Sequence, residues 1–113
     1  MDALRRYGAM LGRWFRARWG YPNAISKEEG RHLCVTYRVI FDKNMVMQHV
    51  DEKPSRRSGN RMFDQSVLTL FKGLITNHVQ LPAPPEEVAD RYLGMVEITM
   101  TGNENEDSAQ CRW

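Results

Sequence analysis

Large apolar side chains recur along the chain with two different spacings, and these predict helices and strands in turn. In residues 2–19 the spacing is three or four positions, which marks one buried face of an amphipathic helix. The members of this face are Leu4, Tyr7, Leu11, Trp14, Phe15 and Trp19. Residues 61–76 repeat the spacing, and Asn60 precedes them as a natural N-cap, so they predict a second long helix.

Three other segments alternate apolar and polar positions, as half-buried strands do. The first, residues 33–41, is followed by a turn at residues 42–44, where Asn44 is a good candidate for a positive φ. Residues 45–50 then return as the second strand of a hairpin. The third strand comprises residues 94–101. Its two faces carry Val96, Ile98 and Met100 on one side and Met95, Glu97 and Thr99 on the other.

The predicted order of elements is helix, strand, strand, helix, strand. Two antiparallel strands cannot bury an apolar face alone, so the third strand should join the hairpin. Both main helices should then pack on one face of a three-stranded antiparallel sheet, which makes the fold class α+β. With 113 residues the chain has room for one such domain. We assign residues 1–102 to this domain and residues 103–113 to a flexible acidic tail.

Between the second helix and the third strand lies the segment LPAPPEE, residues 81–87. Pro82 forces an extended conformation on the residue before it, and Pro84 and Pro85 hold a short polyproline stretch. Pro85 is also well placed to begin a helical turn over residues 86–92. A ligand for SH3 or WW domains is the rival interpretation. A stiff connector is favoured, because the segment joins two elements that must pack together.

Composition and charge exclude few functions. The chain is 42% hydrophobic with three Trp, as expected of a packed globule, and its net charge of +2 is only mildly basic. The basic loop at residues 53–61 supports an alternative function, in which a small α+β domain binds nucleic acid through this loop. The arginines of residues 4–19 would also suit a helix lying on an anionic membrane, although its apolar face is needed to cover the sheet. No apolar run approaches the roughly 20 residues that span a bilayer, and no secretory signal is apparent.

Residues with potential for catalysis or metal binding are scattered along the chain. His32, His49 and His78 lack the spacing of a zinc site. Cys34 and Cys111 are too far apart for a CxxC motif, so a disulfide between them and two independent thiols both stay open. No convergent polar cluster is visible. We therefore expect no catalytic residues, no metal and no cofactor, and we predict that the protein is not an enzyme.

Four features follow one another along the chain. An initial helix carries Tyr7, Trp14 and Trp19, and the strand–turn–strand LCVTYRVIFDKNMVMQHV comes next. Ser58 and Gly59 precede the helix FDQSVLTLF, and LPAPPEEV leads into the last strand MVEITM. In this succession, over residues 4–101 and thus nearly the whole domain, the sequence resembles the C-terminal domain of the TonB/TolA family.

The resemblance implies a non-catalytic, periplasmic interaction module, the C-terminal domain of a protein anchored in the inner membrane. Such domains couple an inner-membrane motor, through the upstream region, to an outer-membrane or periplasmic protein in energy transduction, envelope integrity or gliding motility. The usual mode is β-strand addition, in which an extended peptide pairs with the exposed last strand. The partner-binding residues implied here are Gly94, Met95, Val96, Glu97, Ile98, Thr99, Met100 and Thr101. The resemblance implies no nucleic-acid partner.

The predicted edge strand has little to protect it from pairing. Exposed edges are usually guarded by Lys, Pro or a bulge, and here Glu97 is the one guard. We expect the edge to be used by a partner or by a second copy in a homodimer, in preference to being covered by residues 102–113. Cys34 is similar in position to a cysteine of TolA-type domains, whose second cysteine would fall near residues 63–64. This chain has none there, and Cys111 is the substitute that the resemblance suggests.

Overall fold

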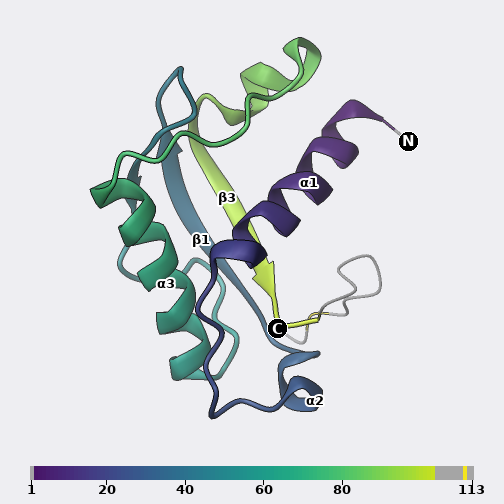
Figure 1. Cartoon of the computed structure of the whole chain (residues 1–113), viewed down its shortest axis with the longest axis vertical. Helices are drawn as coiled ribbons and strands as arrows, with labels where there is room; N and C mark the ends of the chain where they lie inside the picture. The colour runs from purple at the N-terminus through teal and green to yellow at the C-terminus, as the bar shows by residue number, and fades with distance from the viewer. Residues whose placement is uncertain (1, 104–110, 112–113) are drawn as a thin grey trace.

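A computed structural model gives the arrangement of the chain and describes residues 2–103 and 111 (Figure 1). Its helices are α1 (Ala3–Arg18), the single-turn α2 (Lys27–Gly30), α3 (Arg61–Thr76) and the 3-10 helix η1 (Glu86–Tyr92). Its strands are β1 (Cys34–Phe41), β2 (Met47–Val50) and β3 (Gly94–Thr101). The predicted order and the predicted α+β class are confirmed.

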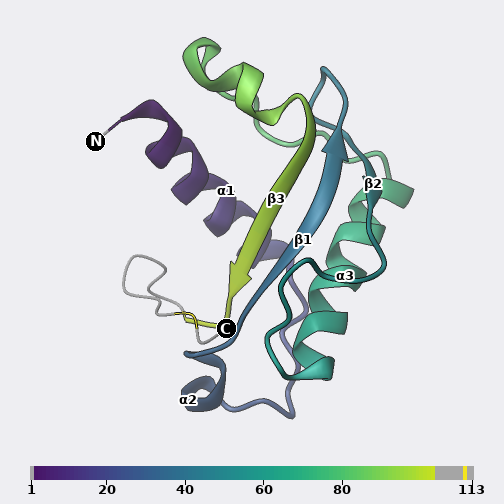
Figure 2. The same ribbon diagram turned by 180° about the vertical axis from the view of Figure 1, so that it is seen from behind.

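The strands form one antiparallel sheet in the order β2-β1-β3. Pairing between β1 and β3 runs from Cys34 opposite Thr101 to Phe41 opposite Gly94. Both long helices lie on one face of this sheet, as the front and back views show (Figure 1 and Figure 2). They meet over the core, where edge-to-face contact brings the ring centroids of Phe15 and Phe71 to 5.4 Å.

Each long helix begins at a side-chain cap. Asp2 Oδ1 accepts a hydrogen bond from Arg5 N at 2.8 Å, and Asn60 Oδ1 accepts one from Phe63 N at 3.1 Å. These bonds satisfy backbone N–H groups that the first turn of a helix leaves without a partner. The prediction that Asn60 caps the second long helix is therefore confirmed.

Tyr37 lies at the centre of the core. Its side chain is fully buried, and its hydroxyl donates a hydrogen bond to the backbone oxygen of Asp64 at 2.8 Å. Burial, with a smaller contribution from the Asp64 charge, raises the pKa of Tyr37 to about 12. Burial also raises the pKa of Asp64, although hydrogen bonds from Ser58 oppose the shift. The bond from Tyr37 thus fixes the start of α3 to the middle strand of the sheet.

The hairpin turn differs from its prediction. Met45, with φ of 60°, takes the left-handed conformation expected of Asn44. The carboxylate of Asp42 explains the shift, because Oδ1 accepts hydrogen bonds from Asn44 N at 2.8 Å and from Val46 N at 3.0 Å. Met45 is only 5% exposed, so its conformation also serves to place an apolar side chain in the core. The second strand consequently begins at Met47, two residues later than predicted.

The face of the sheet away from the long helices is partly covered as well. Cys34 and Thr36 alternate with core positions in β1, yet both are buried. The loop after β2 runs beside them, since Thr36 N donates to Arg56 O at 3.0 Å. Cys34 is joined to Cys111 by a disulfide, with 5.4 Å between the two Cα atoms. The loop and the disulfide together bury side chains on this face, so the alternation of apolar and polar residues along β1 predicts less burial there than the structure has.

The proline segment packs between elements that are distant in sequence. Leu81 is buried, and its N–H donates to Met45 O in the hairpin turn at 2.9 Å. The Tyr7 hydroxyl donates to the backbone oxygen of Pro82. The segment is therefore held by both the hairpin and α1, a position that agrees with a connector.

The predicted flexible tail lies mostly outside the described residues, which omit 104–110 and 112–113. Its first residue, Asn103, is described, and its N–H donates to Thr101 Oγ1 at 3.1 Å. Gly102, immediately before it, is buried, and its N–H donates to Leu33 O at 3.1 Å. A Cβ at Gly102 would collide with the backbone of Gly30 in α2. Only glycine fits where α2 and the end of β3 meet.

We predict that Gly102→Ala lowers the free energy of unfolding by about 1–3 kcal/mol, because backbone must shift to admit the new methyl group. Urea denaturation measures the change. Gly20→Ala is the matched control, since a Cβ there meets nothing within 4 Å, and it should change stability by less than about 0.5 kcal/mol. Equal effects of the two variants would contradict the packing described for Gly102.

The disulfide closes a loop with a sequence separation of 77. We predict that its reduction lowers the free energy of unfolding by about 2–4 kcal/mol, mainly because the reduced unfolded chain gains conformational freedom. Urea midpoints with and without a phosphine reductant give the value. Cys111→Ser should show the lower stability in both conditions, and a response of this variant to reductant would contradict the assignment.

Candidate functional site

The two edges of the sheet differ in how much of their backbone is hydrogen-bonded to other segments of the chain. Beside β2, Val46 forms an isolated bridge with Gln80, and Leu81 N bonds to Met45 O. On the opposite side, β3 pairs with β1 along its whole length and has no strand beyond it among the described residues. The predicted partner-binding strand is thus an edge strand. We take its outer side as the candidate site.

Two hydrogen bonds at the end of β3 reveal which of its backbone groups face outward. Gly102 N bonds toward β1, at Leu33 O, whereas Thr101 O points the other way and accepts from Arg16 on α1. Backbone groups of successive residues in an antiparallel strand face opposite sides. Met100, Ile98 and Val96 therefore pair with β1. The outward groups belong to Met95, Glu97, Thr99 and Thr101.

The outward groups in the middle of β3 have no protein partner in the described part of the chain. No hydrogen bond there involves the backbone N–H or C=O of Met95, Glu97 or Thr99. Each of these residues offers one donor and one acceptor on a single line. That line is a template for another extended segment.

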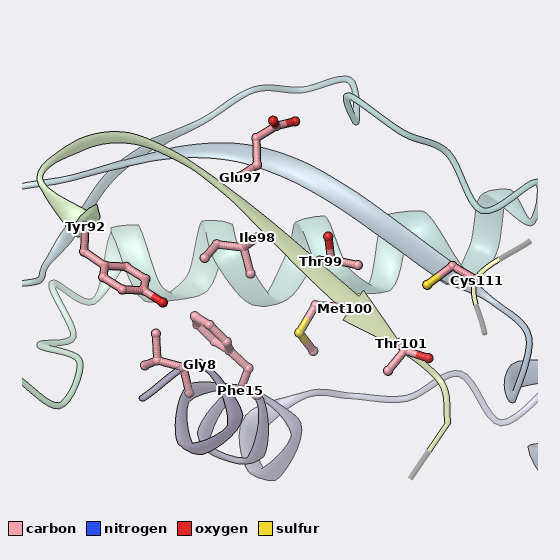
Figure 3. Close-up of a pocket in the computed structure, with 11 residues that line it drawn as sticks. Gly8, Phe15, Tyr92, Glu97, Ile98, Thr99, Met100, Thr101 and Cys111 are labelled. Carbon is pink, nitrogen blue, oxygen red and sulfur yellow. The ribbon is translucent and has the colours of Figure 1, made fainter. Parts of the chain in front are cut away.

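A groove runs along this edge, between β3 and α1 (Figure 3). Its volume is about 350 Å³, within the usual range of about 300–1,000 Å³ for ligand pockets. Its β3 side is formed by residues 97–101, and Cys111 adds to its lining. Gly8, Leu11, Gly12 and Phe15 form its α1 side, and Tyr92 of η1 completes it. We call this space the edge groove.

Gly8 explains why the edge groove has room on its α1 side. Gly8 and Gly12 are four residues apart, which places them on one face of α1. A Cβ at Gly8 would meet just one atom within 4 Å, the hydroxyl oxygen of Tyr92 at 3.9 Å. Alanine would therefore fit, and it would favour the helix by about 0.5–1 kcal/mol. The missing side chain leaves space beside the strand edge.

Aromatic residues fix the end of the edge groove near η1. The rings of Tyr7 and Tyr92 pack edge to face with centroids 5.0 Å apart. Burial raises the pKa of Tyr92, and burial together with Tyr92 raises the pKa of Tyr7 to about 12. Both phenols therefore stay neutral at physiological pH. Both serve as packing groups rather than as charged ones, and Tyr7 also donates the hydrogen bond to Pro82 O.

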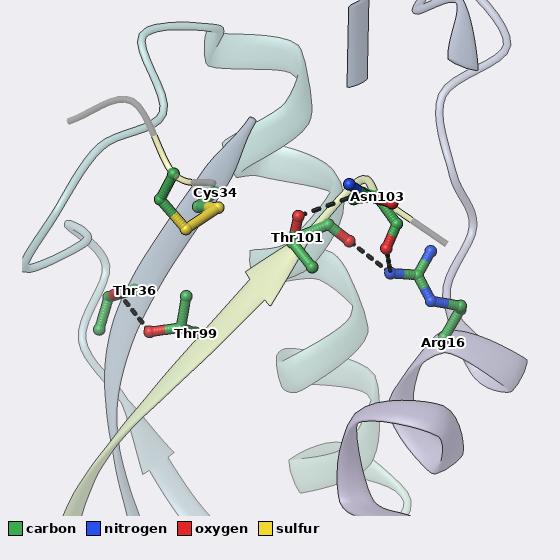
Figure 4. The surroundings of a disulfide bond; sticks show 7 residues. Arg16, Cys34, Thr36, Thr99, Thr101 and Asn103 are labelled. Atoms are coloured by element: carbon green, nitrogen blue, oxygen red, sulfur yellow. Dashed lines mark hydrogen bonds between the residues drawn. A yellow bond between two sulfur atoms is a disulfide. The ribbon is translucent and has the colours of Figure 1, made fainter. Parts of the chain in front are cut away.

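The predicted guard of the edge, Glu97, is turned away from α1 (Figure 3). Its Oε2 accepts from Ser55 Oγ at 2.8 Å and lies 3.9 Å from Arg38 Nε. The neighbouring hydroxyls of Thr36 and Thr99 lie 2.7 Å apart, also across the β1–β3 pair (Figure 4). These contacts hold the polar side chains over the sheet. They do not block the outward backbone groups.

Exposed apolar side chains gather near the start of β3. Met95 is 63% exposed and is paired across the strands with Ile40, which is 39% exposed. Leu93, just before the strand, is 52% exposed. An apolar surface beside unpaired backbone groups is typical of a protein interaction site.

Other candidate residues do not converge on a site. Burial raises the pKa of Asp64, while hydrogen bonds from Ser58 and the charge of Arg57 in the basic loop oppose the shift, so this cation lies near an acid. Glu52, just before the loop, pairs with Lys72 at 2.8 Å. Such neighbours do not favour a phosphate-binding surface. Among residues 2–103 and 111, no group of three His, Cys, Asp or Glu side chains is placed to hold a metal ion.

The sequence pointed to the strand of this site but missed the helix beside it. Gly8, Gly12 and Tyr92 line the edge groove, and Arg16 holds its strand at one end. The pair of glycines inside a strongly amphipathic helix is the signal that could have found the α1 side.

Within the described residues, no helix is both long and apolar enough to cross a membrane. Comparisons with protein families, curated proteins and solved structures found no match. The resemblance to the TonB/TolA family therefore stays a prediction.

We predict that Gly8→Ala raises the free energy of unfolding by about 0.5–1 kcal/mol, because the methyl group fits and alanine favours the helix. Thermal and urea denaturation measure the gain. Gly94→Ala is the contrasting variant, since Gly94 has a φ of 78° that alanine adopts with strain, and it should destabilise the protein. A loss of stability in Gly8→Ala would show that the α1 side is tighter than described.

Proposed function

We propose that this protein is a non-catalytic interaction module, which binds an extended segment of a partner protein by adding it as a strand beside β3. The observation that carries the proposal is the line of outward backbone groups on Met95, Glu97 and Thr99, which have no partner among the described residues. Glu97 and Thr99 also line the edge groove. A sheet edge is complementary to extended backbone and to no other secondary structure. The proposed occupant is therefore a peptide segment in β conformation.

Backbone pairing and side-chain burial would contribute different parts of the binding. Each new backbone hydrogen bond contributes a net of about 0.5–1.5 kcal/mol, whatever the partner sequence. Alternate side chains of the added strand would point into the edge groove, against Leu11, Phe15 and Met100. These apolar walls would select the partner. Affinity thus comes from the backbone and specificity from the groove.

Two further observations support the cellular setting implied by the resemblance to the TonB/TolA family. The disulfide between Cys34 and Cys111 is the kind of bond that persists in an oxidising compartment such as the periplasm. The order of elements, ending in the edge strand, is the order that the resemblance requires. We therefore propose a periplasmic module that links an inner-membrane motor to an outer-membrane or periplasmic protein.

The decisive variant removes one outward N–H group without touching the pairing with β1. We predict that Glu97→Pro weakens peptide binding at least tenfold, because proline lacks the donor and its ring occupies the edge. The probes are 12-residue peptides selected from a random phage-displayed library on the wild-type protein. Affinity is measured by calorimetry, and the site is located by backbone amide shifts in NMR spectra.

Glu97→Ala is the matched control, since it loses the same contacts to Ser55 and Arg38 but keeps the N–H group, and it should bind within about threefold of wild type. Gly8→Leu should also weaken binding, because its side chain would enter the edge groove. Shifts confined to α3, or equal binding by Glu97→Pro and wild type, would overturn the proposal. Pairing between two copies would instead appear as concentration-dependent shifts on β3 without peptide.

A further inference from the structure

Arg16 reaches from α1 to the end of β3 (Figure 4). Its Nη2 atom donates to Thr101 O at 2.6 Å and to Asn103 O at 2.8 Å. The carbonyl of Thr101 is one of the outward groups on the free edge of β3. The guanidinium therefore occupies the place that an added strand would use to continue its pairing.

The charge and surroundings of Arg16 make this contact hard to displace. Hydrogen bonds from a charged donor are shorter and about twice as strong as neutral ones. The guanidinium also lies near the ring of Trp19, with its central carbon 5.8 Å from the ring centroid. Trp19 is in turn fixed, because it is buried and its indole N–H donates to Ser66 Oγ at 2.9 Å. A partner strand would have to replace these contacts with ordinary amide bonds.

At the other end of β3 the strand begins at Gly94, whose φ of 78° departs from strand geometry. The outward groups between these limits belong to Met95, Glu97 and Thr99. An added strand that pairs with all three needs about five residues, because outward groups recur at every second position. The exposed side chains of Met95 and Ile40 lie at the start of this stretch and offer apolar contact there.

We infer that Arg16 is a register-determining residue of the edge groove, which stops an added strand at Thr99 and selects a partner segment of about five extended residues with an apolar side chain beside Met95. This inference rests on the proposed function, because it concerns the same edge. Arg16 acts by position and does not itself have to touch the partner.

The test measures how far pairing extends along β3. Peptides selected on the wild-type protein are truncated and lengthened two residues at a time, and their affinities are measured for wild type, Arg16→Met and Arg18→Met. Affinity for wild type should reach a plateau at about five paired residues. In Arg16→Met, two further residues should increase affinity on the order of tenfold, through bonds to the freed Thr101 groups.

Arg18→Met is the matched control, because Arg18 stacks on Trp14, with its guanidinium carbon 3.8 Å from the ring centroid, and bonds within its own helix. The affinity of Arg18→Met should reach its plateau at the same peptide length as the affinity of wild type. A variant that is merely destabilised would weaken all peptides alike and leave the plateau where it was. The same plateau in Arg16→Met and wild type would overturn the inference.

Amide hydrogen exchange of the wild-type complex gives a second test that does not depend on the folding of any variant. Bound peptide should slow the exchange of the Glu97 and Thr99 amides and leave the exchange rate of the Thr101 amide unchanged. Protection of Thr101 together with Thr99 would refute the stop at Arg16 but support strand addition. Absence of protection along the whole of β3 would instead refute the proposed function.

Discussion

The pairing register of β1 against β3 is the constraint on which the rest of the structure depends. It places Val96 and Met100 over the core and, by the same alternation, turns the backbone groups of Glu97 and Thr99 outward. A slip of one residue would exchange the two faces of β3 and expose the core side chains. The buried core therefore specifies which backbone groups the edge offers. Packing and the proposed binding site are two consequences of one register.

Contacts at the C-terminal end of β3 secure that register. Near its end, Gly102 packs against Gly30 and bonds to Leu33, so the strand cannot advance past α2. The disulfide joins Cys34, which pairs with Thr101, to the chain beyond the strand. Because these contacts join segments far apart in sequence, the edge is held by the whole fold. A rigid edge loses less conformational freedom when a partner binds than a mobile one would.

The elements of this fold could be predicted because each follows a simple period, and the edge position of β3 followed from their order. The helix beside the edge could not be assigned to the site, since the position of Gly8 beside Tyr92 and β3 depends on tertiary packing. Asn44 was the expected left-handed residue, but the Asp42 carboxylate organises the turn differently and gives Met45 that role. Glu97 was expected to protect the edge from pairing. Its contacts with Ser55 and Arg38, which hold its side chain over the sheet, depend on the tertiary fold and could not be predicted.

A free edge is a hazard as well as a site, because backbone groups pair with any extended chain. In this fold α1 lies along the edge, so an incoming strand must fit its side chains into the edge groove as well as its backbone to β3. A chain with the wrong side chains gains the hydrogen bonds but loses the fit, which lowers its affinity relative to a true partner. Gly8 of α1 would leave room in the groove for such a partner, at a cost in helix stability. If β3 binds a partner as proposed, the flanking helix would convert an edge that could pair with any strand into one that discriminates among strands.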